Sequence, residues 1–291
     1  MTGLMDRVAG APISWGVCEV PGWGHQLEAE RVLTEMRDVG LVATEFGPDG
    51  FLPDDPATKA AALAEHGLAA VGGFVPVLLH DPDHDPLPGV DGALDSFLAS
   101  GAEVLVLAAA SGSDGYDSRP ELDAVAWTRL LANLDRLAAH AAGRGVRACL
   151  HPHVGTMVET ADDVRRVLEG SGVPLCLDTG HLLVGGSDPV ALAADATDRI
   201  AHTHLKDVDV SWARRVQSGE STYTAAVAAG MYRPLGQGDV DVAAIVTTLE
   251  AAGYDGWYVM EQDTVLGSER DGDRALDDVR AGVAFLQGIA G

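Results

Sequence analysis

An acid and a histidine stand close together where an apolar run ends, in the stretch CLDTGHLLVGG at 176–186. Asp178 closes the run, and His181 follows three positions later. An ionised carboxylate taken out of water needs a charged partner or a metal ion, because its desolvation is costly. Asp178 therefore predicts that the rest of the chain supplies such a partner. The alternative is a cap on the following turn, made by hydrogen bonds to backbone N–H groups.

Three other apolar runs end in side chains that can bind metal, namely His151, His204 and Glu261. Two imidazoles and two carboxylates suit one divalent ion, Mn²⁺, Co²⁺, Mg²⁺ or Zn²⁺, with positions left for substrate or water. Each residue alone also has an ordinary explanation, a hydrogen-bonded histidine or a salt bridge at the rim. The recurrence favours a metal site. Spacing does not decide between His202 and His204, which share one face of their strand.

The elements that must position these residues alternate along the chain. Apolar runs of strand length are separated by amphipathic stretches such as 121–145. The runs lie at 11–16, 42–47, 69–79, 103–110, 146–151, 173–178, 200–206 and 256–261. Such alternation predicts right-handed βαβ units and a parallel sheet. Eight units predict an α/β chain that forms a single (β/α)₈ TIM barrel with a parallel eight-stranded core, one domain over residues 1–291.

An open, doubly wound sheet is the structural alternative. It requires a glycine-rich phosphate turn after the first strand, and GVCEVPGWGHQ at 16–26 has no such pattern. On a barrel, the carboxyl ends of the strands meet at one mouth, where active sites are built. The candidate ligands are therefore expected to converge there. The longest irregular stretch, 207–238, is predicted to be an active-site loop.

Composition and charge narrow the class of partner. The formal net charge of −25 would repel a phosphate backbone, so nucleic acid is not expected to bind. The N-terminal stretch MTGLMDRVAGAPISW has no apolar segment long enough for a signal peptide, and no apolar run is long enough for a membrane span, which predicts a cytoplasmic protein without a membrane partner. Its three cysteines form no CxxC pair, which argues against a disulfide framework. A small-molecule ligand remains.

Several phrases resemble those of a known family, in its order and spacing. They are LHPHVGTMVET, CLDTGHLL, HTHLKDV, RPLGQGDVD and YVMEQD, with PISWG near the start. The chain is similar over essentially its whole length to the xylose isomerase-like TIM barrels, which include sugar isomerases, ketose 3-epimerases, inosose dehydratases and endonuclease IV. Among these, the inosose dehydratase branch looks closest.

The resemblance implies one divalent ion bound by His151, Asp178, His204 and Glu261, and it favours His204 over His202. Many members have glutamate where this chain has His151. The ketose epimerases use two metal-bound glutamates, one on each face of the substrate. With a histidine at one of these positions, epimerisation by two such bases is disfavoured.

The resemblance also implies a substrate, a polyhydroxylated ketone such as a sugar or keto-inositol. Polarisation of the carbonyl by the ion would acidify the neighbouring carbon, and a base would remove its proton. Loss of a β-hydroxyl makes the enzyme a dehydratase, whereas reprotonation elsewhere makes it a sugar isomerase or ketose 3-epimerase. A barrel that binds sugar without catalysis is the non-enzymatic alternative.

Glu261, Lys206 and His153 are the candidate catalytic residues. Lys206 lies on the strand face of the predicted histidine ligand, and a nearby cation would lower the pKa of its ammonium and favour base chemistry. The alternative is a solvated lysine at the rim, paired with Asp207. His153 is a candidate acid or hydroxyl ligand; alternatively, it orients the histidine ligand beside it.

Four further residues are candidates for substrate contact. Glu45 ends the second strand, across the mouth. His181 contacts substrate or, alternatively, orients Asp178. Trp15 forms an apolar wall for a sugar ring or is a core residue. Arg233 lies in a loop that closes over substrate or packs against another subunit of a homo-oligomer.

Overall fold

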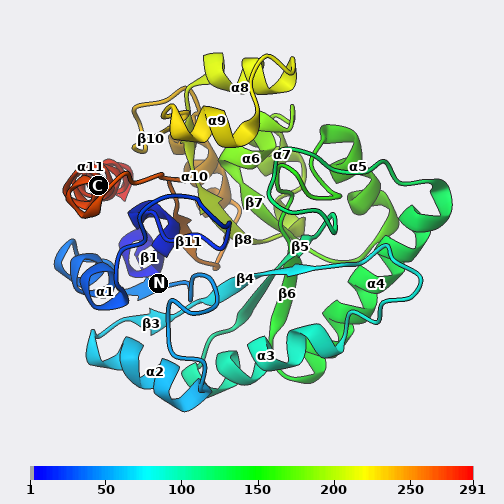
Figure 1. Cartoon of the computed structure of the whole chain (residues 1–291), viewed down its shortest axis with the longest axis horizontal. Coiled ribbons are helices and arrows are strands. Elements are labelled where there is room, and N and C mark those ends of the chain that lie inside the picture. The colour runs from blue at the N-terminus through cyan, green and yellow to red at the C-terminus, as the bar shows by residue number, and fades with distance from the viewer. Residues whose placement is uncertain (1–2, 291) are drawn as a thin grey trace.

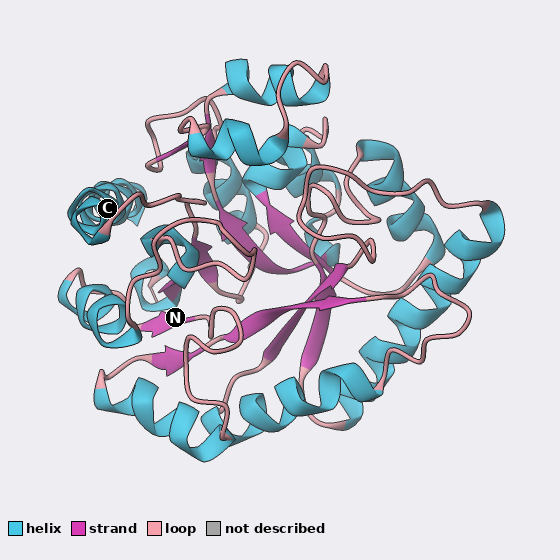
Figure 2. Cartoon of the chain, viewed as in Figure 1, coloured by secondary structure: helices cyan, strands magenta, loops and turns pink. Residues whose placement is uncertain are grey.

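The computed structural model describes residues 3–290 and shows a barrel of parallel strands inside a ring of helices (Figures 1 and 2). Within these residues, the order around the sheet is β3-β2-β1-β11-β8-β7-β6-β5-β4. The strands are β1 (Val8–Gly10), β2 (Ala43–Thr44), β3 (Ala69–Ala70), β4 (Gly72–Val77), β5 (Val104–Ala109), β6 (Arg147–Leu150), β7 (Leu175–Asp178), β8 (Ile200–Leu205) and β11 (Tyr258–Met260). The predicted fold class, a TIM barrel, is confirmed.

The helices surround this sheet and cover its outer face (Figure 2). They are α1 (Ala29–Asp38), α2 (Pro56–Glu65), α3 (Pro88–Ser100), α4 (Ala124–Gly143), α5 (Ala161–Gly170), α6 (Thr179–Val184), α7 (Pro189–Asp195), α8 (Val210–Gln217), α9 (Tyr223–Ala228), α10 (Val242–Ala251) and α11 (Gly272–Ala290). α4, which lies within the predicted amphipathic stretch 121–145, buries Leu130, Leu134 and Leu137 against the barrel. None of the helices described between residues 3 and 290 is long and apolar enough to cross a membrane.

Val71 closes the barrel between the two ends of the strand order. Its N–H donates to the carbonyl of Thr44 on β2 at 3.0 Å, and its carbonyl accepts from Glu103 and Val104 at 3.1 and 3.2 Å. β3 and β4 are thus two halves of the single predicted run at 69–79. Within the described residues, the nine strands of the sheet therefore occupy eight strand positions around the barrel, because β3 and β4 together fill one position.

The first predicted strand is wrong in position. The strand is β1 at Val8–Gly10, and most of the predicted run 11–16 is a 3-10 helix, Pro12–Trp15. Pro12 has no N–H to give to a sheet, and Gly16 ends the turn with a φ of 78°, which glycine adopts without steric cost. The other predicted runs contain the remaining barrel strands.

The stretch 207–238, predicted to be irregular, is ordered into secondary structure. It contains α8, α9 and an antiparallel pair made of β9 (Asp207–Val208) and β10 (Tyr232–Arg233). Asp209 caps α8 through the N–H of Ser211, and Thr222 caps α9 through the N–H of Ala225. Figure 1 shows α8 and α9 next to each other, near α6.

The buried carboxylate of Asp207 holds the loop that carries the phrase PLGQGDVD. Oδ2 accepts the N–H groups of Gly236 and Gly238, both at 2.9 Å, and Oδ1 accepts those of Val208 and Val240 at 2.9 and 3.0 Å. A Cβ at Gly238 would overlap Asp207 Oδ1, so only glycine permits this approach.

Replacing Asp207 with alanine is expected to lower the free energy of unfolding by about 3 kcal/mol, because four N–H groups, one of them buried and three partly buried, lose a charged acceptor. Urea unfolding measures this change. The matched control is Asp239→Ala: Asp239 is exposed and accepts one N–H, that of Val210 at 2.9 Å, so a loss below about 1 kcal/mol is expected. Equal losses in both variants would contradict the anchoring role of Asp207.

Candidate metal centre and active site

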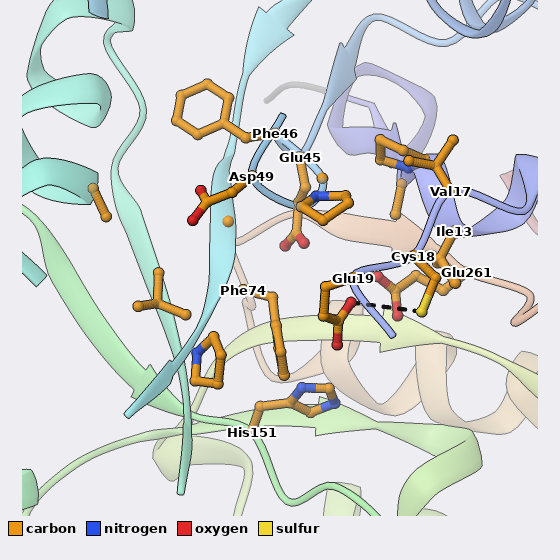
Figure 3. A pocket seen from close by; sticks show the side chains of 18 of the residues that line it. Ile13, Val17, Cys18, Glu19, Glu45, Phe46, Asp49, Phe74, His151 and Glu261 are labelled. Atoms are coloured by element: carbon orange, nitrogen blue, oxygen red, sulfur yellow. Dashed lines mark hydrogen bonds between the residues drawn. The ribbon is translucent and has the colours of Figure 1, made fainter. Parts of the chain in front are cut away.

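A cavity of about 840 Å³ opens at the carboxyl ends of the barrel strands. Polar side chains that follow β2, β6, β8 and β11 line its inner wall, namely Glu45, His151, Lys206 and Glu261. Figure 3 shows Glu45, His151 and Glu261 turned toward the same hollow from separate strands. The location agrees with the rule that barrel active sites lie at this face.

Three of the four candidate ligands meet around one point. Ligand atoms of Asp178, His204 and Glu261 all lie within 4.8 Å of one another. His204 Nδ1 is 3.6 Å from Asp178 Oδ2 and 3.2 Å from Glu261 Oε2. The fourth, His151, places Nε2 3.1 Å from the same Asp178 oxygen and forms a second such group with Asp178 and His181. The barrel therefore brings all four to one mouth.

These donors fit a divalent cation. Among residues 3–290, His204 Nδ1 is buried without a hydrogen-bond partner, and the carboxylates of Asp178 and Glu261 face it. Acceptors that converge in a buried site repel one another unless a proton or a metal ion lies among them. Imidazole nitrogen with carboxylate oxygen is a donor set for Mn²⁺, Co²⁺ or Zn²⁺.

Asp178 has two separate tasks. Its Oδ1 accepts the N–H groups of Gly180 and His181 at 2.9 and 2.7 Å and so caps α6, while Oδ2 faces the histidines. Burial opposes ionisation, but the Lys206 ammonium and the surrounding imidazoles hold the pKa of Asp178 well below its usual range. The sequence offered two explanations for Asp178, a helix cap and a charged partner. In the structure Asp178 has both, since it caps α6 and lies beside Lys206.

Lys206 lies inside a ring of carboxylates. Nζ is 3.3 Å from Asp178 Oδ2, 3.0 Å from Glu261 Oε2 and 2.8 Å from Asp263 Oδ1. Burial lowers the pKa of Lys206, but these carboxylates outweigh it and hold the pKa well above its usual range. A solvated pair with Asp207 is wrong, because Lys206 is only 2% exposed. Lys206 is therefore an ammonium ion that lines the cavity.

Sequence reasoning did not single out Asp263. Its Oδ2 accepts from the hydroxyl of Tyr223 at 2.6 Å, and both residues line the cavity. Burial raises the pKa of Asp263, and the like charge of Glu261 raises it further. The Lys206 ammonium lowers this pKa but does not outweigh the other two effects. A signal existed: Asp263 lies two positions after Glu261, which places both on one side where the chain is extended.

His153 is a neutral imidazole with a defined tautomer. Its Nδ1 lies 2.7 Å from the carbonyl oxygen of Val154, which can only accept, so Nδ1 carries the hydrogen. Burial, together with the neighbouring charges of His151 and Lys206, holds the pKa of His153 well below its usual range. Nε2 therefore keeps its lone pair. Because His153 also lines the cavity, this nitrogen is available as a base.

His181 lies behind the cavity wall and is 1% exposed. Its Nε2 is 3.0 Å from Nζ of Lys206, which as an ammonium must donate. Its backbone N–H, not its ring, bonds to Asp178. Its ring thus contacts Lys206 and the backbone N–H of Val154, the latter at 3.4 Å.

Trp15 and Arg233 lie apart from this group. Trp15 is fully buried, and its indole N–H donates to Glu35 on α1 at 2.7 Å. It is the core residue of the two alternatives. Arg233 is on β10, with a side chain 44% exposed that pairs with Asp209 at 3.1 Å. The structure thus places neither at the cavity wall.

Two loops meet at the outer wall of the cavity. The hydroxyl of Tyr116, in the loop after β5, donates to the carboxylate of Glu19, in the loop after β1. The Tyr116 ring lies against His153, with centroids 4.4 Å apart. Figure 3 shows Glu19 turned toward the hollow that contains His151. No local sequence signal marks this contact, because it joins loops 97 positions apart.

Comparison with known proteins gives a consistent assignment. Residues 33–288 match the family model described as xylose isomerase-like TIM barrel. An inosose dehydratase of Geobacillus thermodenitrificans (strain NG80-2) is 31% identical over 264 residues, 87% of this chain and 88% of the relative.

Two solved structures share the fold. An L-ribulose 3-epimerase superposes with a TM-score of 0.68 and 18% identity, covering 98% of this chain and 94% of the other. The IOLI protein, solved with a binding zinc atom, superposes with a TM-score of 0.69 and 13% identity over 98% of each chain. At these identities the likeness concerns the fold.

Proposed function

The chain belongs to the xylose isomerase-like TIM barrel family, and we propose that it is a divalent-metal-dependent dehydratase of a keto-inositol or related polyhydroxylated ketone. The observation that carries the proposal is the cavity wall. It combines a cluster of metal-binding side chains with a neutral imidazole, His153, and a buried ammonium, Lys206. These are the groups that proton removal and hydroxyl loss require. Likeness to an inosose dehydratase supports the choice of substrate.

His151, Asp178, His204 and Glu261 would hold the ion. A divalent cation bound there supplies Lewis-acid polarisation of the substrate carbonyl. The residues themselves orient the ketone and place its reacting carbon against the cavity wall. Oε2 of Glu45, which lines the cavity, is the acceptor proposed for a substrate hydroxyl.

His153 is the proposed base. Its Nε2 takes the proton from the carbon next to the carbonyl, since Nδ1 is already committed to Val154. Neutral imidazole accepts this proton without first losing one, because its pKa lies well below its usual range. The proton then rests on Nε2 of His153.

Lys206 is the proposed acid. Its ammonium gives a proton to the β-hydroxyl as the carbon–oxygen bond breaks, and a water molecule leaves. Asp263 and Glu261 keep this lysine charged before the step, through contacts of 2.8 and 3.0 Å. One proton is taken from carbon and one is given to oxygen, so the net change is loss of water and formation of a carbon–carbon double bond.

The test is incubation of the purified chain with a keto-inositol in the presence of Mn²⁺ or Co²⁺, followed by mass spectrometry. The expected product is lighter than the substrate by one water, and prior treatment with a chelator abolishes it. Parallel incubations with fructose and tagatose test the alternative of a sugar isomerase or ketose 3-epimerase, whose products keep the substrate mass. Conversion of ketohexoses with none of the keto-inositol would overturn the proposal. Saturable binding without turnover of any substrate would instead favour a sugar-binding barrel.

A further inference from the structure

The two ring nitrogens of His204 serve opposite sides. Nε2 lies 3.0 Å from Oε1 of Glu45, whereas Nδ1 lies toward the carboxylates of Asp178 and Glu261. Glu45 comes from the segment after β2, across the barrel from β8. Both side chains are almost completely buried, at 3% exposure for Glu45 and 1% for His204. This contact therefore lies in the barrel interior, shielded from solvent.

The hydrogen in this contact belongs to the imidazole. Oε1 of Glu45 lies within hydrogen-bond distance of two ring nitrogens, Nε2 of His204 at 3.0 Å and Nε2 of His202 at 2.9 Å. A carboxylate oxygen approached by two imidazoles accepts from both, so Nε2 of His204 carries the hydrogen. Nδ1 is then the nitrogen free to bind an ion. A carboxylate that holds the second N–H of a histidine is the usual partner of a metal ligand, because it fixes the ring and raises its basicity.

His202 strengthens this arrangement. Its Nε2 also lies on Oε1 of Glu45, at 2.9 Å, and the ring is fully buried. The backbone N–H of Glu45 donates to the carbonyl of Gly10 on β1 at 3.0 Å. Glu45 is thus held from three directions and has little freedom to turn away. Sequence spacing did not decide between His202 and His204. In the structure, His202 contacts Glu45, whereas His204 contacts Glu45 through Nε2 and faces the carboxylates of Asp178 and Glu261 through Nδ1.

We propose that Glu45 is a positioning residue of the metal centre: its Oε1 holds Nε2–H of His204, so that Nδ1 is presented to the ion. The inference rests on the proposed function, since it requires His204 to be a ligand. It differs from a substrate contact through Oε2, because it predicts an effect on metal binding in the absence of substrate.

The variant Glu45→Gln tests the proposal. An amide can donate as well as accept, so it permits the tautomer of His204 with hydrogen on Nδ1, and it removes the negative charge that polarises the ring. Affinity for Zn²⁺, measured by competition with a coloured chelator, is expected to fall by about 10- to 100-fold. Co²⁺ should give a visible absorption spectrum that differs from that of the wild-type chain.

The matched control is Glu35→Gln. Glu35 also accepts a hydrogen bond from a ring N–H, that of Trp15 at 2.7 Å, but it lies on α1 outside the site. Its Zn²⁺ affinity is expected to stay within about twofold of wild type, a range narrow against the loss predicted for Glu45→Gln. Equal affinities of Glu45→Gln, Glu35→Gln and wild type would overturn the positioning role.

A second measurement does not depend on how the variant folds. In the wild-type chain labelled with ¹⁵N-histidine and loaded with Zn²⁺, NMR is expected to show His204 bound through Nδ1, with a protonated Nε2. Ligation through Nε2 would overturn the proposal. A wild-type chain that binds no Zn²⁺, Mn²⁺ or Co²⁺ would instead overturn the metal site itself, which separates failure of the proposed function from failure of this inference.

Discussion

Replacing Glu261 with glutamine is expected to lower turnover of a keto-inositol by roughly 10³-fold and to reduce bound metal in the purified protein. Glu261 is 9% exposed, lies 3.2 Å from Nδ1 of His204 and 3.0 Å from Nζ of Lys206, and lines the cavity. Glutamine has nearly the same shape as glutamate but carries no negative charge. The divalent ion and the Lys206 ammonium would therefore both lose the opposite charge that Glu261 supplies. Elemental analysis and steady-state kinetics measure the two effects.

A carboxylate elsewhere in the barrel provides the control. Glu250, on α10, accepts from Arg7 and Tyr258 and lies outside the cavity wall. Glu250→Gln is expected to leave metal content and turnover close to those of the wild-type chain. Full turnover and full metal content in Glu261→Gln would remove Glu261 from both the ligand set and the catalytic residues.

Replacing Lys206 with methionine has the second large expected effect, this time on stability as well as turnover. Methionine leaves Asp178, Glu261 and Asp263 buried without their ammonium partner. Removal of one partner from a buried ion pair costs about 3–5 kcal/mol, and loss of a proton donor costs about 10²- to 10⁴-fold in turnover. Added metal is expected to restore part of the lost stability, since a divalent cation replaces the missing positive charge.

Unfolding in denaturant, with a chelator and with added Mn²⁺, measures this dependence. The chain has one other lysine, Lys59, which is half-buried and lies over the ring of Phe46 at 5.3 Å. Lys59→Met is expected to change the free energy of unfolding by no more than about 0.5 kcal/mol, with no added sensitivity to metal. If Lys206→Met were as stable as wild type without metal, the ring of carboxylates would not depend on this lysine.

Hydrophobic periodicity predicted most of the barrel because it reports which face of a local segment is buried. The run 103–110 is apolar after its first residue, as expected for a strand covered on both sides, and it contains β5. The same signal misplaced the first strand, since Pro12 and Gly16 impose a turn within an apolar run. It also missed α8 and α9 within 207–238, which are short helices set by their caps.

The candidate ligands were predictable for a different reason. Parallel strands end at one mouth, so polar residues at strand ends converge whatever the detail of the loops. That rule is sufficient for His151, Asp178, His204 and Glu261. The rule does not predict the positions of Trp15 and Arg233. Trp15 packs against α1 through Glu35, and Arg233 pairs with Asp209.

Residue types and their order along the chain were thus enough for the parallel barrel and for the four side chains at its mouth, because both depend on local patterns and on one topological rule. Only the folded chain decided which contacts these side chains make. The bond from Glu45 to His204 spans 159 positions, and the contact between Lys206 and Asp263 joins two strand ends. Contacts of this kind depend on ångström-scale packing between distant segments, for which no local pattern carries a signal.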